Sequence, residues 1–445
     1  MNNKKAPAER AILVGIRHPR QSSLDARESL FELERLTHTA GAVVVATTQQ
    51  EIKKIEPATY VGKGKLEEIS GLVASHGADT VVFDEDLSPG QNRNLEETLR
   101  CKVVDRTGLI LDIFAQHAKS KEGKLQVELA QCLYFLPRLV GQWAHFGRLG
   151  GGIGTRGPGE TQLEVDRRRV RERISRIKQQ LQRVESSRHL HRRQREGVPI
   201  PTVAMVGYTN AGKSTLMNQL TQAGVLVEDK LFATLDPTVR RLKLPSGRQV
   251  LLSDTVGFIR KLPHALVEAF KATFEEVRAA DLLLHVIDSS YPTWQQQKEV
   301  VEGVLRELGL QEKPTIEVYN KIDLLGASAA NGHGARISAR TGQGVEELLS
   351  QIEDRLHEGF RTYRVQVPYE RCDCLEWLYR VGEVEGRQDA ESGVLMRVVL
   401  SPEDVGRLRK ERGIRLRLWN AADELAASFR EKPRAGLGQA ALSEA

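Results

Sequence analysis

The sequence predicts an α/β fold in several domains. The chain of 445 residues is too long for a single hydrophobic core. Short apolar segments alternate with helical patterns near the N-terminus, as in a parallel sheet covered by helices. Residues 207–214 match the phosphate-binding pattern G-x-x-x-x-G-K-[ST] between a strand and a helix. We therefore expect an α/β domain at 1–118, an antiparallel helical hairpin at 119–197, a mostly parallel P-loop domain flanked by helices at 198–359, a small α+β domain at 360–431 and a disordered tail at 432–445.

The composition is that of a cytoplasmic protein. Apolar residues make up 40% of the chain, and no apolar run approaches the roughly 20 residues of a membrane span. The first residues are charged and no apolar stretch follows them, so we expect no signal peptide. Four scattered cysteines do not form a disulfide framework, and Cys372 and Cys374 lack the second ligand pair of a zinc site. We expect a cytoplasmic monomer without a membrane span.

The first domain alternates strands with helices. Strands are predicted where short apolar runs occur, at 11–16, 42–46, 80–84 and 102–105. Helical spacing occupies 24–40, 64–76 and 91–100. The segment 60–65, YVGKGK, leads into a helix but lacks the spacing of a phosphate loop. It is either a weak second nucleotide site or a basic loop facing an RNA backbone.

The hairpin is predicted from two apolar seams joined by a glycine-rich loop. In the first helix, Leu125, Leu129, Cys132 and Leu136 recur at steps of 4, 3 and 4. The second helix has the narrow seam of a coiled coil, formed by Leu163, Val170, Ile174, Ile177, Leu181 and Val184. The loop at 147–159 holds seven glycines in thirteen residues.

Positive charge is concentrated in this hairpin. From Arg167 to Arg195 there are twelve lysines and arginines against two glutamates. The hairpin is either a spacer with a solvated basic face or an arm that contacts RNA. We favour RNA, because arginines neutralise phosphates and glycines let the backbone approach them closely. The candidate contacts are Arg148 and Arg156 in the loop and Arg167, Arg168 and Arg169 on the helix.

The phosphate loop is the strongest motif of the chain. Backbone N–H groups of 207–214, with the N-terminus of the following helix, form a cradle for the α- and β-phosphates. Lys213 would reach the β- and γ-phosphates, and Ser214 would give its hydroxyl to Mg²⁺.

Three shorter motifs follow other strands of the same domain. In Asp254-Thr255-Val256-Gly257, Asp254 would hold Mg²⁺ through water and the Gly257 N–H would bond the γ-phosphate. In Asn320-Lys321-Ile322-Asp323, Asp323 can accept two hydrogen bonds from guanine, which allows a discrimination against adenine of roughly 10⁴–10⁵. The backbone N–H groups of Ser338 and Ala339 could contact guanine O6. Because all these motifs would lie at the carboxyl edge of one sheet, we predict a GTP site.

Two features of this site bear on hydrolysis. The loop at 231–238 would supply a second Mg²⁺ ligand in the GTP state, and Thr234 and Thr238 compete for the role. Many GTPases place a glutamine directly after the D-x-x-G glycine to orient the attacking water, whereas this chain has Phe258. We therefore expect slow hydrolysis by the free protein and activation by a partner. The expected catalytic residues are Lys213, Thr234, Asp254 and Gly257.

The expected GTP contacts come from all these segments. They are Gly207, Tyr208, Thr209, Asn210, Ala211, Gly212, Lys213, Ser214, Thr215, Phe232, Ala233, Thr234, Leu235, Asp236, Asp254, Thr255, Val256, Gly257, Asn320, Lys321, Ile322, Asp323, Ser338 and Ala339.

The last domain is the least informative. Strands are predicted at 362–367 and 394–400, and helices at 374–381 and 401–411.

With these motifs, the sequence resembles the HflX-type GTPases of the Obg–HflX group. The resemblance is carried by 207–214, 232–238, 254–258 and 320–323, and outside the P-loop domain by 105–114 and 150–162. It covers most of residues 10–360. It implies a GTPase that binds the large ribosomal subunit and its rRNA through the N-terminal domain and hairpin, and that splits or rescues stalled ribosomes under stress.

The resemblance also bears on cofactors. It favours Thr234 over Thr238 as the Mg²⁺ ligand. Some related GTPases hold K⁺ with an asparagine at the position of Asn210, although this residue could equally serve hydrogen bonds within the loop. Some family members use ATP in the N-terminal domain, for which 62–65 gives weak support. Two competing functions remain, a non-catalytic RNA-binding adaptor and a GTPase of tRNA modification or ribosome assembly.

Overall fold

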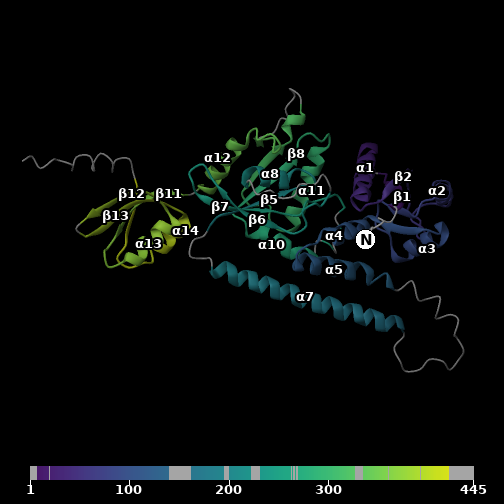
Figure 1. Cartoon of the computed structure of the whole chain (residues 1–445), viewed down its shortest axis with the longest axis horizontal. Coiled ribbons are helices and arrows are strands. Elements are labelled where there is room, and N and C mark those ends of the chain that lie inside the picture. The colour runs from purple at the N-terminus through teal and green to yellow at the C-terminus, as the bar shows by residue number, and fades with distance from the viewer. Residues whose placement is uncertain are drawn as a thin grey trace, which may run out of the picture. The chain divides into compact units, whose positions relative to one another are not determined.

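The computed structural model divides into two compact units (Figure 1). The first contains residues 1–192 and 200–353, and the second contains 193–199 and 354–445. The structure describes residues 8–19, 21–139, 162–194, 200–221, 231–261, 263, 266, 269–325, 334–358, 360–390 and 392–419. Among these residues, no helix is both long enough and apolar enough to cross a membrane.

The N-terminal sheet is parallel, with the strand order β2-β1-β3-β4. Its strands are β1 (Arg10–Arg17), β2 (Val43–Glu51), β3 (Thr80–Phe83) and β4 (Lys102–Asp105), and its helices are α1 (Ser23–Thr39), α2 (Lys63–His76), α3 (Pro89–Leu99) and α4 (Arg106–His117). The predicted strands and three helices are confirmed, whereas α4 was not predicted. Alternate residues of β1 enter two cores, Leu13 beside Leu33 of α1 and Ile12 beside Ile69 of α2. The sheet is therefore buried on both faces, as parallel sheets are.

Side-chain caps fix where these helices begin. Ser88 and Gln91 form a capping box at α3, with Pro89 in the first turn. Asp105, the last residue of β4, accepts the Gly108 N–H at 2.8 Å and so caps α4. The β4-to-α4 turn is therefore specified by one short motif.

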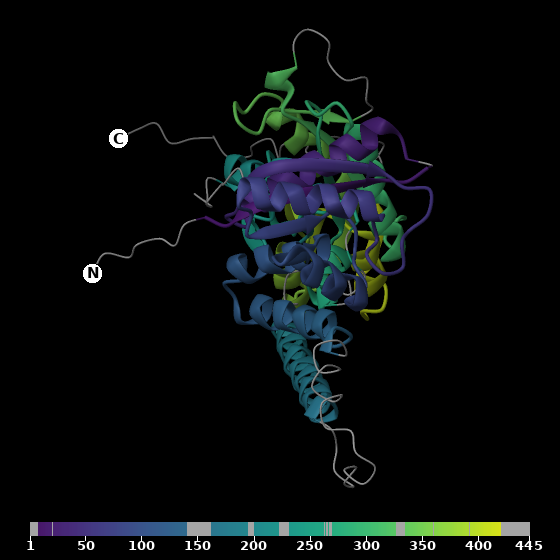
Figure 2. The ribbon, with the colours of Figure 1, turned by 90° about the vertical axis from the view of Figure 1, so that its right-hand side faces the viewer.

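The helical pair consists of α5 (Lys121–Phe135) and α7 (Gln162–Gln194), which lie side by side (Figures 1 and 2). Described residues of both predicted seams face inward: Leu125 and Leu129 of α5 and Ile177 of α7 are buried. Arg173 of α7 pairs with Glu128 of α5 at 2.5 Å. The glycine-rich loop between the helices lies outside the described residues, as do Arg148 and Arg156.

The central sheet has the order β10-β9-β8-β5-β7-β6, parallel except for β6. Its strands are β5 (Thr202–Gly207), β6 (Thr238–Lys243), β7 (Gln249–Asp254), β8 (Leu282–Asp288), β9 (Thr315–Asn320) and β10 (Ala335–Arg336). Its helices are α8 (Lys213–Thr221), α10 (Lys271–Ala279), α11 (Trp294–Glu307) and α12 (Val345–Leu356). The four predicted motifs begin where β5, β7, β9 and β10 end, at one edge of the sheet, as expected for a doubly wound fold.

The second unit holds the small C-terminal domain. Its elements are β11 (Arg361–Val367), α13 (Cys372–Val381), β12 (Glu383–Ala390), β13 (Gly393–Leu400), α14 (Pro402–Leu408) and β14 (Arg415–Leu418). The predicted strands and helices are confirmed, but β12 and β14 were missed. Cys372 and Cys374 are not disulfide-bonded, and no cluster of three metal-ligating side chains occurs among the described residues.

Candidate functional site: a nucleotide pocket

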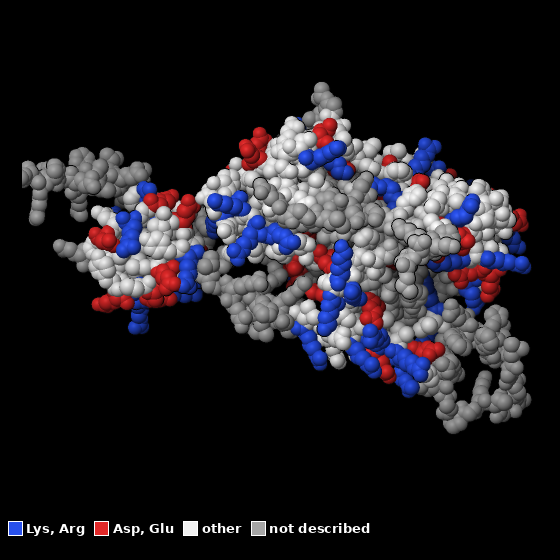
Figure 3. Space-filling model, viewed as in Figure 1, with Lys and Arg blue, Asp and Glu red and all other residues white. Residues whose placement is uncertain are grey.

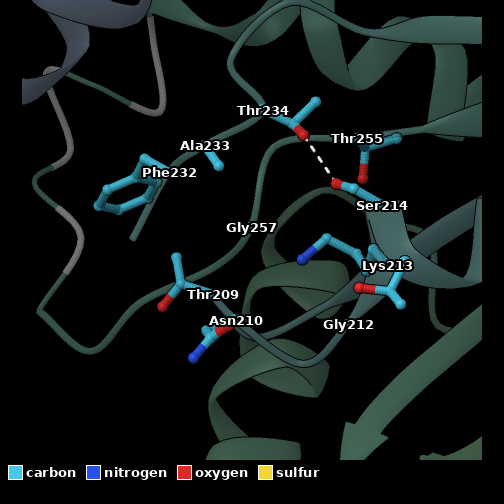
Figure 4. Close-up of a pocket in the computed structure, with 11 residues that line it drawn as sticks. Thr209, Asn210, Gly212, Lys213, Ser214, Phe232, Ala233, Thr234, Thr255 and Gly257 are labelled. Carbon is cyan, nitrogen blue, oxygen red and sulfur yellow. Dashed lines mark hydrogen bonds between the residues drawn. The ribbon is translucent and has the colours of Figure 1, made fainter. Parts of the chain in front are cut away.

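The phosphate loop lines a cavity together with parts of two other loops (Figure 4). Only glycine fits at Gly257, because a Cβ there would lie 2.9 Å from the Thr209 Cα and 3.0 Å from the Lys213 Nζ. Asn210 adopts a left-handed backbone conformation (φ 62°) within the loop. The residues that line the cavity are Thr209, Asn210, Gly212, Lys213, Ser214, Thr215, Phe232, Ala233, Thr234, Thr255 and Gly257.

Lys213 is the charged group of this cavity. Its side chain extends from the start of α8 into the cavity, and its ammonium donates to the carbonyls of Gly207 (3.1 Å) and Tyr208 (2.9 Å). Burial lowers the pKa of Lys213 to about 8, although Asp254 opposes the change. Burial likewise raises the pKa of Asp254, against the effect of Lys213 and Ser214. Both charges are therefore poorly solvated, which favours an ionic ligand that would compensate them.

Three side-chain oxygens converge beside Lys213. The Ser214 hydroxyl lies 2.8 Å from the Thr234 hydroxyl and donates to Asp254 Oδ2 at 2.7 Å. Asp254 Oδ1 is buried, and no protein group within the described residues bonds it. Hydroxyl and carboxylate oxygens are the ligands that Mg²⁺ prefers, so this cluster fits the ion. Thr238 instead begins β6 and pairs with Asp254 in the sheet.

On the base side, Asn320 joins the guanine motifs to the phosphate loop. Its amide donates to the Ala211 carbonyl at 2.9 Å and accepts the Ala339 N–H at 2.9 Å. Gly212 leaves room for this contact, because a Cβ there would lie 2.2 Å from Asn320 Nδ2. Asn320 thus connects the two parts of the site by hydrogen bonds, a role that the motif alone does not indicate.

The other base-side residues lie around Asn320. Asp323 is exposed at the start of a short 3₁₀ helix (Ile322–Leu324), and the Lys321 ammonium pairs with Asp288 at 2.6 Å. The Ser338 N–H bonds the Gln343 carbonyl. Since the Ala339 N–H also has a protein acceptor, contact with guanine O6 would require these amides to share or exchange acceptors.

Phe258 does not face the cavity. Its ring is 1% exposed and stacks on Phe274, with 5.7 Å between the centroids. Its backbone instead connects the D-x-x-G segment to the phosphate loop by two hydrogen bonds. The Phe258 N–H donates to the Gly207 carbonyl, and the Phe258 carbonyl accepts the Thr209 N–H. The side chain is therefore structural.

The loop that carries Thr234 is also attached to the N-terminal half of the same unit. Phe232 packs edge-on against Phe114 of α4, with 4.7 Å between the centroids. Asp236 accepts the N–H groups of Lys119 (2.9 Å) and Ser120 (2.7 Å), and the Ser120 hydroxyl as well. Ser120 is the N-cap of α5. The same short loop therefore contacts both the oxygen cluster and the start of the helical pair.

A second connection to the N-terminal half starts at Tyr208, and the sequence motifs did not predict it. The Tyr208 hydroxyl donates to Glu32 and accepts the Arg260 N–H at 2.8 Å. Glu32 pairs with Arg106, which also bonds Asp84 at 2.7 Å. Burial opposes the ionisation of Asp84, but Arg106 and Lys261 hold its pKa below the ordinary value. The only sequence signal was a Tyr in the phosphate loop and an Arg at the start of a buried helix.

The other sequence-predicted residues lie away from the pocket. Arg168 and Arg169 of α7 are exposed and make i,i+4 and i,i+3 pairs with Glu172 and Asp166, and Arg167 is half-buried. Lysines and arginines lie over this part of the molecule in Figure 3, interspersed with acidic residues. In the segment 60–65, Gly62 is the N-cap of α2 and Lys65 pairs with Glu68 at 2.8 Å.

A mostly parallel sheet with a phosphate loop, an oxygen cluster that fits Mg²⁺ and a guanine motif at one edge defines a P-loop GTPase. Family models match the chain almost throughout: a GTP-binding GTPase N-terminal region (27–115), a GTP-binding GTPase middle region (117–195), a 50S ribosome-binding GTPase (202–321) and an HflX C-terminal domain (325–418). The chain belongs to the HflX family of GTPases.

Two relatives in sequence support this membership over nearly the full length, and one solved structure is also similar. The GTPase HflX of Caldanaerobacter subterraneus is 53% identical over 402 residues, covering 90% of this chain and 93% of that protein. The GTPase HflX of Escherichia coli is 44% identical, covering 91% and 96%. A solved structure of a GTP-binding protein from Sulfolobus solfataricus in complex with GDP is 25% identical with a TM-score of 0.42, covering 79% of this chain and 99% of that one.

Proposed function

We propose that this GTPase binds the large ribosomal subunit and works as a nucleotide-dependent switch that splits or rescues stalled ribosomes. The observation that carries this proposal is the loop from Phe232 to Asp236. Its centre contacts Ser214 through Thr234, and its end contacts the N-cap of α5 through Asp236. A change at the γ-phosphate would therefore reach the helical pair directly.

Within the site, the proposed roles follow the contacts. Ser214 and Thr234 would hold Mg²⁺, with Asp254 acting through water, and the ion would neutralise charge on the β- and γ-phosphates. Lys213 would bind the same phosphates, Gly257 would donate its N–H to the γ-phosphate, and Asp323 would select guanine. Asn210 lines the phosphate end of the pocket, where K⁺ remains a candidate cofactor. The segment 62–65 is likewise a candidate for a weak ATP site.

The ribosome would complete the catalytic site. Phe258 is buried against Phe274 and cannot orient water, so the free protein would hydrolyse GTP slowly. The test is the GTPase rate of the purified protein with and without saturating 50S subunits. We expect strong stimulation, and an unchanged rate would refute activation by the ribosome.

The basic helix α7 would provide the RNA contact. Replacing Arg167, Arg168 and Arg169 by Gln should weaken 50S binding and shift its salt dependence, because each phosphate contact releases counterions. A matched control replaces three exposed arginines elsewhere, Arg278, Arg306 and Arg355. Equal binding by both triple variants would remove α7 from the interface.

Splitting is distinguished from ribosome assembly by sedimentation. With GTP, a splitting factor converts 70S ribosomes to free subunits, whereas an assembly or other RNA-binding GTPase leaves the 70S peak unchanged. The adaptor without catalysis is set aside, since the family is one of GTPases.

A further inference from the structure

The C-terminal domain has one covered and one open sheet face. Its chain order is strand-helix-strand-strand-helix-strand, and its antiparallel sheet has the order β12-β13-β11-β14. This is the split βαβ arrangement. Leu378 of α13 and Leu408 of α14 share one core with Val365 of β11 and Met396 of β13. Both helices therefore cover the same face (Figure 1).

The strand registers show which residues lie on the other face. In β13, Val394, Met396, Val398 and Leu400 are at most 1% exposed, so Arg397 between them faces away from the helices. Arg397 lies opposite Arg364 of β11, and Arg364 lies opposite Arg417 of β14. Three arginines thus form one row across three neighbouring strands. Arg415, two residues before Arg417, lies on the same face.

This row is unfavourable for the isolated domain. Like charges directly opposite one another on a sheet are destabilising, and neighbouring strands are only about 4.8 Å apart. Arg397 is compensated by Glu385 at 2.9 Å. Arg364, Arg415 and Arg417 make no ion pair with any described acidic residue. A polyanion on this face would relieve the repulsion.

An aromatic side chain lies beside the row. Trp419 follows β14, where its N–H bonds the Thr362 carbonyl and extends the pairing to β11. The Arg397 guanidinium lies over the Trp419 ring, 5.2 Å from its centroid. Trp419 is partly exposed. One class of RNA-binding module uses the open face of a four-stranded sheet in this way, stacking unpaired bases on aromatic rings and guanidinium planes.

We propose that the open face of the C-terminal domain, defined by Arg364, Arg397, Arg415, Arg417 and Trp419, binds single-stranded RNA. The arginines contact phosphates and stack on bases, and Trp419 stacks on one base. The bases of double-stranded RNA are stacked inside the helix and its major groove is too deep and narrow for side chains to read, so unpaired nucleotides fit this surface better than double-stranded RNA. This proposal rests on the C-terminal domain alone and does not depend on the RNA contact proposed for α7.

The test compares variants of the full-length protein in binding a labelled single-stranded oligoribonucleotide. R364Q/R417Q removes two charges from the face, and R380Q/R409Q removes two from the helix side of the same domain as a matched control. We expect at least a tenfold weaker affinity for the face variant and less than a twofold change for the control. The slope of log K against log salt should fall by about 1.4, since each phosphate contact contributes about 0.7 for single strands.

Trp419→Ala provides an independent readout. Removing one stacked base should weaken binding about tenfold while leaving the salt slope unchanged, because stacking releases no counterions. Thermal unfolding of R364Q/R417Q should show no loss of stability, since the variant removes repulsion. If both double variants bind RNA equally well, the proposal is wrong. It is also wrong if the face variant loses binding to polyglutamate but not to RNA, because the partner would then be an acidic protein.

Discussion

Asp236 offers the sharpest test of the connection between the nucleotide and the helical pair. In this structure the Thr234 hydroxyl contacts Ser214 in the oxygen cluster while Asp236 accepts the N–H groups of Lys119 and Ser120. With Thr234 in its proposed role as an Mg²⁺ ligand, both contacts are made together, so the attachment at the start of α5 would support the loop in the arrangement that a γ-phosphate requires. GDP binding does not need this arrangement.

The magnitude follows from the hydrogen bonds that the Asp236→Ala substitution removes. Three hydrogen bonds to a carboxylate disappear, which at a partly exposed site amounts to about 2 kcal/mol in total. This corresponds to about a thirtyfold weaker affinity for a non-hydrolysable GTP analogue. Affinity for GDP should change less than twofold. Gly123→Ala should likewise weaken the affinity for the GTP analogue, since the added Cβ, on the α5 side of the contact, would lie 2.2 Å from Asp236 Oδ1.

The assay is equilibrium titration of both nucleotides with a fluorescent label. Asp79→Ala is a matched control, because Asp79 also accepts a backbone N–H, that of Arg10 at 2.9 Å, but lies far from the loop in sequence and outside the pocket. An unchanged ratio of GTP-analogue to GDP affinity in Asp236→Ala would refute the reasoning. Equal weakening for both nucleotides would indicate general damage to the pocket.

Two further predictions concern buried side chains of the GTPase domain. Burial lowers the pKa of His285 in β8 to about 4, below its ordinary 6.5, so its folded form binds fewer protons and stability is lost as pH falls through this window. The loss of stability should reach about 2 kcal/mol at pH 5. Hydrogen exchange of the β8 amides should detect this loss. His285→Leu should make the loss smaller, whereas His38→Gln, at an exposed site, should leave it unchanged. Phe258→Gln should not accelerate GTP hydrolysis, because position 258 is packed against Phe274, and should lower stability by roughly 2–4 kcal/mol. A faster rate without ribosomes would contradict this, and Phe31→Gln, at a half-exposed position, is the stability control.

Much of the fold could be predicted because its signals are local. The strand–loop–helix around Lys213 and the strands before Asp254 and Asn320 each require only short apolar runs and fixed spacings. The strands β12 and β14 were missed for the opposite reason. β12 is largely exposed and rich in charged residues, and β14 has only four residues, so neither shows an apolar run.

The sequence by itself determined the nucleotide class, because the groups that recognise phosphate and guanine lie within short motifs whose order fixes their place on one sheet edge. Only the tertiary structure decided which residues connect that edge to the rest of the first unit. Asp236 meets α5 across 116 residues, and Tyr208 meets Glu32 across 176. Such contacts depend on how two sheets and their helices pack, and no local spacing encodes them. The same holds for the arginine row of the C-terminal domain, which exists only once three strands are in register.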